Sequence, residues 1–218
     1  MKKYEFELNE PLYEKACLPI RTKQDMLQLL ALSIKYLICT PINSVGSIPT
    51  EKKMILYVDK MSRLLFCVRE KIFTFQFPLQ VRTNPNDSNH IAITYSGFFD
   101  IDTIVSSLLI AIFTQEDLFA GSLESINDKI SQELIENEWE EVDWETLLDL
   151  VKTLMLFEPG YLRYDHDIKN ANGTLHPEHH LDFFFSSNST MKLGLPGVVT
   201  SDWMLDMLNI LTNCKYIR

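Results

Sequence analysis

Two stretches decide the fold of this chain: Leu162-Arg163-Tyr164-Asp165-His166-Asp167, and His176-Pro177-Glu178-His179-His180-Leu181-Asp182. Both contain residues that favour β-strands, and the Asn172-Gly173 pair between them is a strong turn signal. Four of the five histidines of the chain lie in these stretches. The pattern predicts two antiparallel strands that carry an unusual concentration of titratable side chains.

The two-residue period of a strand sorts these side chains onto two faces. Leu162, Tyr164, Leu181 and Phe183 fall on one side, which we expect to face the core. The opposite side receives a polar set that consists of Arg163, Asp165, His180, Asp182 and, from a third strand, Lys192. The same period turns His179 inward and leaves His166 and His176 near the rim of the polar side.

The third strand is predicted over Thr190 to Leu195, and Pro196-Gly197 ends it. Either Thr200 or Ser201 then caps a last helix with apolar positions at helical spacing. An antiparallel meander covered by that helix would bury the apolar face of the three strands.

The rest of the chain is richer in helices. Helical spacing predicts helices over residues 23–37 and 122–137. It also predicts a helix that begins at a cap, Asp100 or Asp102, and ends at residue 113, and another that begins at residue 143 and ends before Pro159-Gly160. Strands at 71–77 and 90–95 are expected to form a long-looped hairpin, and residues 1–20 an edge strand or an extended arm. Residues 50–68 fit either a helix or two paired strands, with the helix slightly favoured. Residues 40–49 form a loop.

These elements predict an α+β fold in one domain, 1–218, without repeats or a Gly/Ser-rich linker. Its helix-rich part with the hairpin would cover residues 1–157. The meander and terminal helix, which carry the candidate site, would cover 158–218.

Composition limits the classes of function. With 218 residues and a net charge of −10, the chain is ordinary in hydrophobicity and poorly suited to bind duplex nucleic acid by itself. Cys17, Cys39, Cys67 and Cys214 form no C-x-x-C pair and suit a reducing compartment. Neither the N-terminus nor the most apolar run resembles a signal peptide or a membrane span. We therefore expect a cytoplasmic protein that does not contact membranes.

The polar set suits two chemistries. In the first, His176 or His180 binds a divalent metal ion together with Asp165 and Asp182, and the ion activates water for phosphoester hydrolysis. In the second, one of the two histidines is a general base, and Arg163 and Lys192 hold a phosphate. The alternative without catalysis is a solvated strand face stabilised by charged cross-strand pairs.

The order Arg163-Tyr164-Asp165-His166-Asp167 followed by His176-Pro177-Glu178-His179-His180-Leu181 resembles a motif of uncharacterised prokaryotic families. In those families an R-[FY]-D-x-D strand precedes H-P-x-x-H-L and a C-terminal helix, and the genes often lie near antiphage-defence or toxin genes. Certain small toxins of toxin–antitoxin pairs carry a similar order. The resemblance covers about the last quarter of the chain and implies roles for Arg163, Asp165, Asp167, His176 and His180.

Two functions follow as expectations. The first is a cytoplasmic subunit of a bacterial defence or toxin-type module, whose polar strand face contacts a protein partner, a nucleotide or, within a complex, RNA. The second is a small nuclease or phosphoesterase, metal-dependent or histidine-based, with His176, His180, Asp165 and Asp182 at its centre. A divalent metal ion is the cofactor that these residues suit, and the sequence leaves its presence open.

Overall fold

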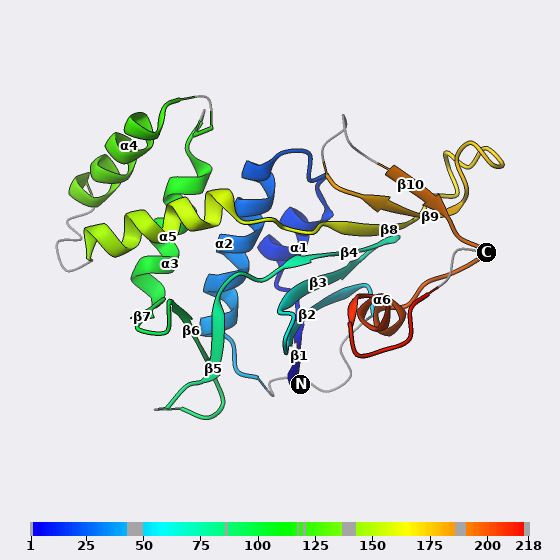
Figure 1. The fold of residues 1–218 in the computed structure, drawn as a ribbon, viewed down its shortest axis with the longest axis horizontal. Coiled ribbons are helices and arrows are strands. Elements are labelled where there is room, and N and C mark those ends of the chain that lie inside the picture. Colours follow the sequence, from blue (N-terminus) through cyan, green and yellow to red (C-terminus); the bar gives the residue numbers. More distant parts are fainter. Residues whose placement is uncertain are drawn as a thin grey trace. The chain divides into compact units, whose positions relative to one another are not determined.

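The computed structural model describes residues 2–42, 50–85, 87–116, 118–119, 121–136, 143–185 and 191–215 (Figure 1). The chain forms two compact units, each assembled from separated segments. Residues 1–17, 45–77 and 159–218 make the first unit, and residues 18–44 and 78–158 make the second. The architecture is α+β, as the sequence predicts. This division into units does not test the expectation of a single domain, which stays a prediction.

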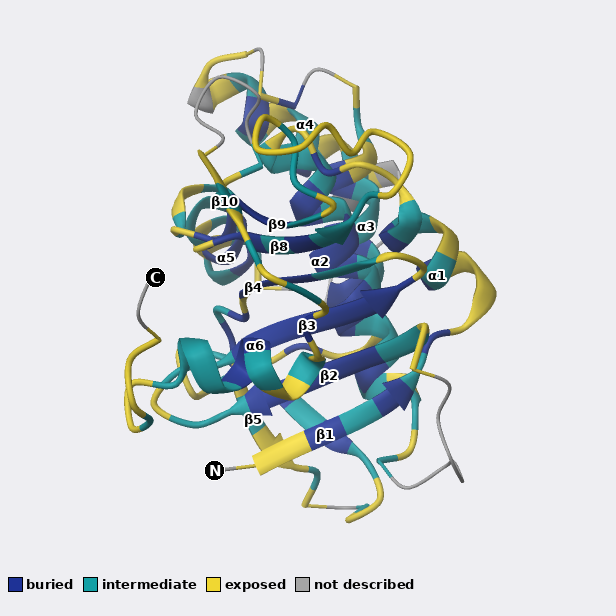
Figure 2. Cartoon of the chain, turned by 90° about the vertical axis from the view of Figure 1, so that its right-hand side faces the viewer, coloured by how far each residue is buried: buried dark blue, intermediate teal, exposed yellow. Residues whose placement is uncertain are grey.

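The first unit is built on a seven-stranded sheet in which all neighbouring strands are antiparallel. In spatial order its strands are β1 (Lys2–Glu7), β2 (Lys52–Val58), β3 (Arg63–Val68), β4 (Lys71–Gln76), β8 (Leu162–His166), β9 (His179–Phe183) and β10 (Met191–Gly194). The part of this unit that the structure describes also contains two helices, α1 (Glu10–Cys17) and α6 (Ser201–Leu208). Figure 2 shows that β3, in the middle of the sheet, is buried along its length.

The C-terminal part of the sheet is the expected meander with a helix after it. Strands β8, β9 and β10 pair in succession, and α6 begins at Thr200, whose hydroxyl accepts a hydrogen bond from the Trp203 backbone N–H at 3.2 Å. Met204 and Leu205 of α6 belong to the same buried cluster as the side chains predicted for the core face of β8 and β9. The strand period and the helix cap were therefore sufficient to predict this part of the fold.

The helix favoured for residues 50–68 is wrong, because these residues form the paired strands β2 and β3. Both strands are almost fully buried, so they lack the alternation of apolar and polar residues that identifies a half-exposed strand. The residues of the turns do not indicate a hairpin either. The β3–β4 turn, for example, uses Arg69 with a φ of 47° where glycine or asparagine is usual.

The hairpin predicted between 71–77 and 90–95 is also wrong. β4 pairs with β3 and β8 in the first unit, whereas β6 (Ile91–Tyr95) pairs with β5 (Gln80–Thr83) and β7 (Phe99–Asp100) in the second. The turn-forming residues between them do close a hairpin, since the Asn84 N–H donates to the carbonyl of His90. Its first strand is the short β5, which has too few apolar residues to stand out in the sequence.

Among the described residues, the second unit combines that three-stranded sheet with four helices, which are α2 (Lys23–Cys39), α3 (Thr103–Thr114), α4 (Leu123–Glu136) and α5 (Trp144–Leu156). Three of these begin at side-chain caps, of which the sequence predicts those at Thr22 and Asp102 but not the one at Asp143. The side chains of Thr22, Asp102 and Asp143 accept hydrogen bonds from the first backbone N–H groups of α2, α3 and α5. None of the described helices combines the length and apolar character needed to cross a bilayer.

At the N-terminus the expected edge strand is β1, but residues 10–17 form the helix α1, which the sequence does not predict. Pro11 lies in the first turn of α1, where a missing N–H costs nothing. The Asn9 side chain accepts a hydrogen bond from the Leu12 N–H at 3.1 Å and so caps this helix. The predicted loop over 40–49 and the turn at 187–189 lie mostly outside the described residues.

We expect Phe66→Ala to destabilise the first unit strongly. The Phe66 side chain is fully buried, and its ring stacks on Phe73 and Phe75 at centroid distances of 4.9 and 5.9 Å. Loss of a buried phenylalanine typically costs about 3–5 kcal/mol. Urea unfolding should show this, with the exposed Leu175→Ala as a control that changes the free energy of unfolding by less than about 0.5 kcal/mol. Equal effects of the two variants would contradict the packing described here.

Candidate functional site

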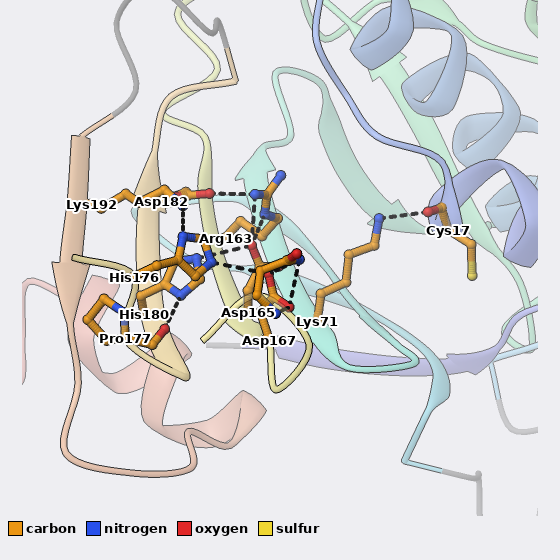
Figure 3. Close-up of polar contacts among 11 residues, drawn as sticks. Cys17, Lys71, Arg163, Asp165, Asp167, His176, Pro177, His180, Asp182 and Lys192 are labelled. Atoms are coloured by element: carbon orange, nitrogen blue, oxygen red, sulfur yellow. Dashed lines mark hydrogen bonds and ion pairs between the residues drawn. The ribbon is translucent and has the colours of Figure 1, made fainter. Parts of the chain in front are cut away.

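The register of β8, β9 and β10 brings the predicted polar set together on one face of the sheet. Arg163 lies directly opposite Asp182, Asp165 opposite His180, and Lys192 opposite Asp182 on its other side. Directly opposed residues of antiparallel strands point to the same face. We call these five residues the polar cluster (Figure 3).

Arg163 is the centre of the polar cluster. Its Nε and Nη2 donate to Asp165 Oδ2 at 2.8 and 2.7 Å, and Nη2 also donates to Asp182 Oδ2. Burial opposes the charge of this guanidinium, but Asp165, Tyr161 and Asp182 outweigh that effect, so its pKa lies above the ordinary value. One guanidinium therefore pairs with two carboxylates at a largely buried position.

Two members of the polar cluster are buried rather than solvated. His180 is 1% exposed and Asp182 is 3% exposed. His180 Nδ1 lies 2.9 Å from the carbonyl oxygen of Pro177, which can only accept, so Nδ1 carries the proton. His180 Nε2 lies 3.6 Å from Asp165 Oδ2. A neutral ring with its proton on Nδ1 is the tautomer in which a histidine can bind a metal ion through Nε2.

Asp182 is only partly satisfied. Its Oδ2 receives the hydrogen bond from Arg163, but its buried Oδ1 has no hydrogen-bond partner among the described residues. The nearest cation is Lys192, whose Nζ is 4.0 Å from Oδ1, too far for a hydrogen bond. Leaving a buried charged acceptor unpaired is costly, so this oxygen marks a position where a cation or a donor would be stabilising.

His176 extends the cluster from the loop before β9. Its Nε2 lies 3.1 Å from Asp167 Oδ2, and its Nδ1 lies 3.3 Å from Lys192 Nζ. Because an ammonium group only donates, Nδ1 accepts and Nε2–H donates to Asp167. Asn170 first, and then His176, lower the pKa of Asp167 to about 2 against the effect of burial. The His176 ring meets the ring of His180 edge-on at a centroid distance of 4.8 Å.

The structure thus places every residue predicted for the site in one group, with His176 at its partly exposed rim. The sequence missed Lys71 on β4, which lies opposite Asp165 and whose Nζ donates to the Cys17 carbonyl at 3.1 Å (Figure 3). Nothing local could have found it, since it depends on the pairing of β4 with β8. The expectation that His166 lies near the rim of the polar side is wrong, because strand alternation places it opposite His179 on the other face of these strands.

No protein-family model, curated protein or solved structure matches this chain. The resemblance of the β8–β9 motif to prokaryotic families near defence and toxin genes therefore stays a prediction.

Replacing Arg163 tests whether the polar cluster depends on one cation. Arg163→Leu removes the guanidinium that pairs with the Asp165 and Asp182 carboxylates. Breaking a buried ion pair in this way typically lowers the free energy of unfolding by about 3–5 kcal/mol. The matched control is Lys192→Leu, which removes a more exposed and more distant cation and should cost no more than about 1 kcal/mol. Chemical denaturation measures both, and a smaller loss in Arg163→Leu than in Lys192→Leu would refute this account.

Lys71 predicts a specific pH dependence. Burial first, and then Arg163, lower the pKa of its ammonium group from 10.5 to about 8. Between these values the unfolded chain binds a proton that the folded protein has released, so Lys71 makes the free energy of unfolding rise with pH. Lys71→Met lacks this contribution. Any stability advantage of the variant at pH 7 should therefore shrink as pH rises from about 8 to 10.5. A constant difference in parallel urea titrations would disprove the shift.

Proposed function

We propose that the polar cluster binds a divalent metal ion and that the protein hydrolyses phosphoester bonds with it. The observation that carries this proposal is the buried Oδ1 of Asp182, which has no hydrogen-bond partner among the described residues. Asp165, His180 and Asp182 each offer a ligand atom, and these atoms lie within 4.8 Å of one another. A cation between them would satisfy Asp182 Oδ1.

The remaining contacts of these three side chains suit ligands. Metal-binding histidines usually donate the other ring N–H to a carbonyl or carboxylate, as His180 does to Pro177. Arg163 holds Oδ2 of both Asp165 and Asp182 and so fixes the orientation of the two carboxylates. One imidazole with two carboxylates is a mixed N/O set suited to Mn²⁺, Fe²⁺ or Zn²⁺.

A bound ion of this kind lowers the pKa of a water molecule and stabilises charge on a phosphoryl oxygen. The rim residues would supply the other functions. His176 Nδ1 is an acceptor that can take a proton, and Asp167 would stabilise the resulting imidazolium. Lys192, between His176 and Asp182, and the partly exposed Arg163 carry positive charge suited to a phosphate.

A second candidate function is that of a binding subunit, because the first unit has an open strand edge. β10 lies at one end of the seven-stranded sheet and is short and largely exposed. Phe184, Met191 and Leu175 are 50%, 56% and 83% exposed. A strand edge and apolar side chains of this kind suit the addition of a partner segment. The cytoplasmic defence or toxin setting of such a subunit, and any contact with RNA or a nucleotide, rest on the motif resemblance.

The experiment compares Mn²⁺ binding and hydrolysis of bis(p-nitrophenyl) phosphate in the parent and in Asp182→Asn. We expect the parent to bind Mn²⁺ by calorimetry and to lose hydrolysis with EDTA. Asp182→Asn should weaken binding by more than the roughly 10- to 100-fold typical for loss of a group that only orients a ligand. The control is Asp128→Asn, which changes an exposed carboxylate in the second unit and should leave both properties unchanged.

His176→Gln separates binding from catalysis. Because His176 is assigned to proton transfer and not to the ion, its loss should lower the hydrolysis rate by about 10²–10⁴-fold with Mn²⁺ affinity retained. Circular dichroism melts of all variants identify any loss of fold. If the folded parent bound no Mn²⁺, or if Asp182→Asn bound it as tightly, the metal-dependent function would be refuted.

A further inference from the structure

A second group of potential metal ligands lies on the opposite face of the same two strands. His166 ends β8 and lies directly opposite His179 at the start of β9, and Glu178 precedes His179. By strand alternation His166 and His179 share the face of Tyr164 and Leu181, away from the polar cluster. All three side chains are at least partly accessible, from 16% for His179 to 49% for Glu178.

The three side chains converge on one carboxylate oxygen. His166 Nε2 lies 2.9 Å from Glu178 Oε1, and His179 Nε2 lies 3.7 Å from the same oxygen. With metal–ligand distances of about 2.0–2.2 Å, ligand atoms of a tetrahedral zinc ion are about 3.3 Å apart. The two observed distances lie on either side of that value, and the three ligand atoms lie within 4.8 Å of one another.

The donor set is also chemically suitable. Two imidazoles with one glutamate are a known set of protein ligands for catalytic zinc, which keeps its fourth position for water or substrate. The buried Tyr164 hydroxyl lies 2.9 Å from His179 Nδ1, so it can accept the Nδ1–H and leave Nε2 for the ion. Tyr164 and His166 also border a cavity of about 290 Å³ in the first unit, which has room for water or a small ligand.

Ion pairing alone does not explain the arrangement as well. An exposed His–Glu pair contributes at most about 1 kcal/mol and needs only one histidine. Here Nε2 of His166 and Nε2 of His179 lie 2.9 and 3.7 Å from the same carboxylate oxygen. The two rings lie with centroids 4.6 Å apart and planes at 22°, so one ring must turn for both Nε2 atoms to bind one ion. If both rings were protonated they would repel each other, whereas a shared Zn²⁺ is compatible with two neutral rings.

We propose that His166, Glu178 and His179 form a Zn²⁺ site, separate from the polar cluster and independent of the function proposed for it. The ion takes the place of the hydrogen bond between His166 Nε2 and Glu178, and a neutral His166 ring then carries its proton on Nδ1. A protonated ring must release one proton before it binds, so binding weakens as the histidines become protonated at low pH.

The test is a Zn²⁺ titration of the full chain against a chromophoric chelator, with Co²⁺ absorption as a second probe of tetrahedral coordination. His166→Ala and Glu178→Gln should each abolish one binding equivalent, or weaken it by more than the roughly 10- to 100-fold that loss of an orienting group costs. The matched control is His90→Ala, which removes the one histidine outside β8, β9 and the loop between them, a residue paired with Asp87 in the second unit. This variant should bind the same number of Zn²⁺ equivalents as the parent.

Asp182→Asn distinguishes the two sites. If the polar cluster also binds Zn²⁺, the parent binds two equivalents. Asp182→Asn should then lose the equivalent at the polar cluster, and His166→Ala should lose the other one. If the polar cluster binds none, Asp182→Asn leaves the single equivalent intact. In NMR spectra of the imidazole nitrogens, Zn²⁺ should shift Nε2 of His166 and His179. The proposal fails if the parent binds no Zn²⁺, or if His166→Ala and Glu178→Gln bind it as the parent does.

Discussion

The pairing of β8 with β9 in a single register is the constraint on which both candidate sites depend. Because side chains alternate, a slip of one residue would exchange the two faces of a strand and separate Arg163 from Asp182. The apolar side chains of the core face and the ion pairs of the polar cluster specify the same register. The strand pair therefore presents a different set of titratable groups on each of its two faces.

The sequence predicts best what depends on near neighbours. Strand alternation separates Arg163, Asp165, His180 and Asp182 from the core, and the caps of α2, α3 and α6 follow from single side chains. It fails where the answer depends on distant parts of the chain. β2 and β3 are buried on both faces and so look like a helix, and the contribution of Lys71 follows from the pairing of β4 with β8.

Strand periodicity does not predict that part of the site is buried. A polar face on an antiparallel sheet is normally solvated, yet His180 and Asp182 are almost inaccessible. Charges in such a position must be paired, and the pairing by Arg163 leaves one oxygen of Asp182 unsatisfied. Two faces of one strand pair would then select cations by different chemistry, oxygen-rich on one side and nitrogen-rich on the other.

The insertion of residues 78–158 between β4 and β8 has a consequence for folding. These two strands are neighbours in the sheet, although residues 78–158 of the second unit lie between them in sequence. Contacts between distant residues form slowly, because the intervening chain must first be brought to closure. During synthesis β1 to β4 leave the ribosome well before β8. The edge of β4 that pairs with β8 is therefore unpaired until β8 has been synthesised. Assembly of the polar cluster and protection of that edge are therefore the same late event.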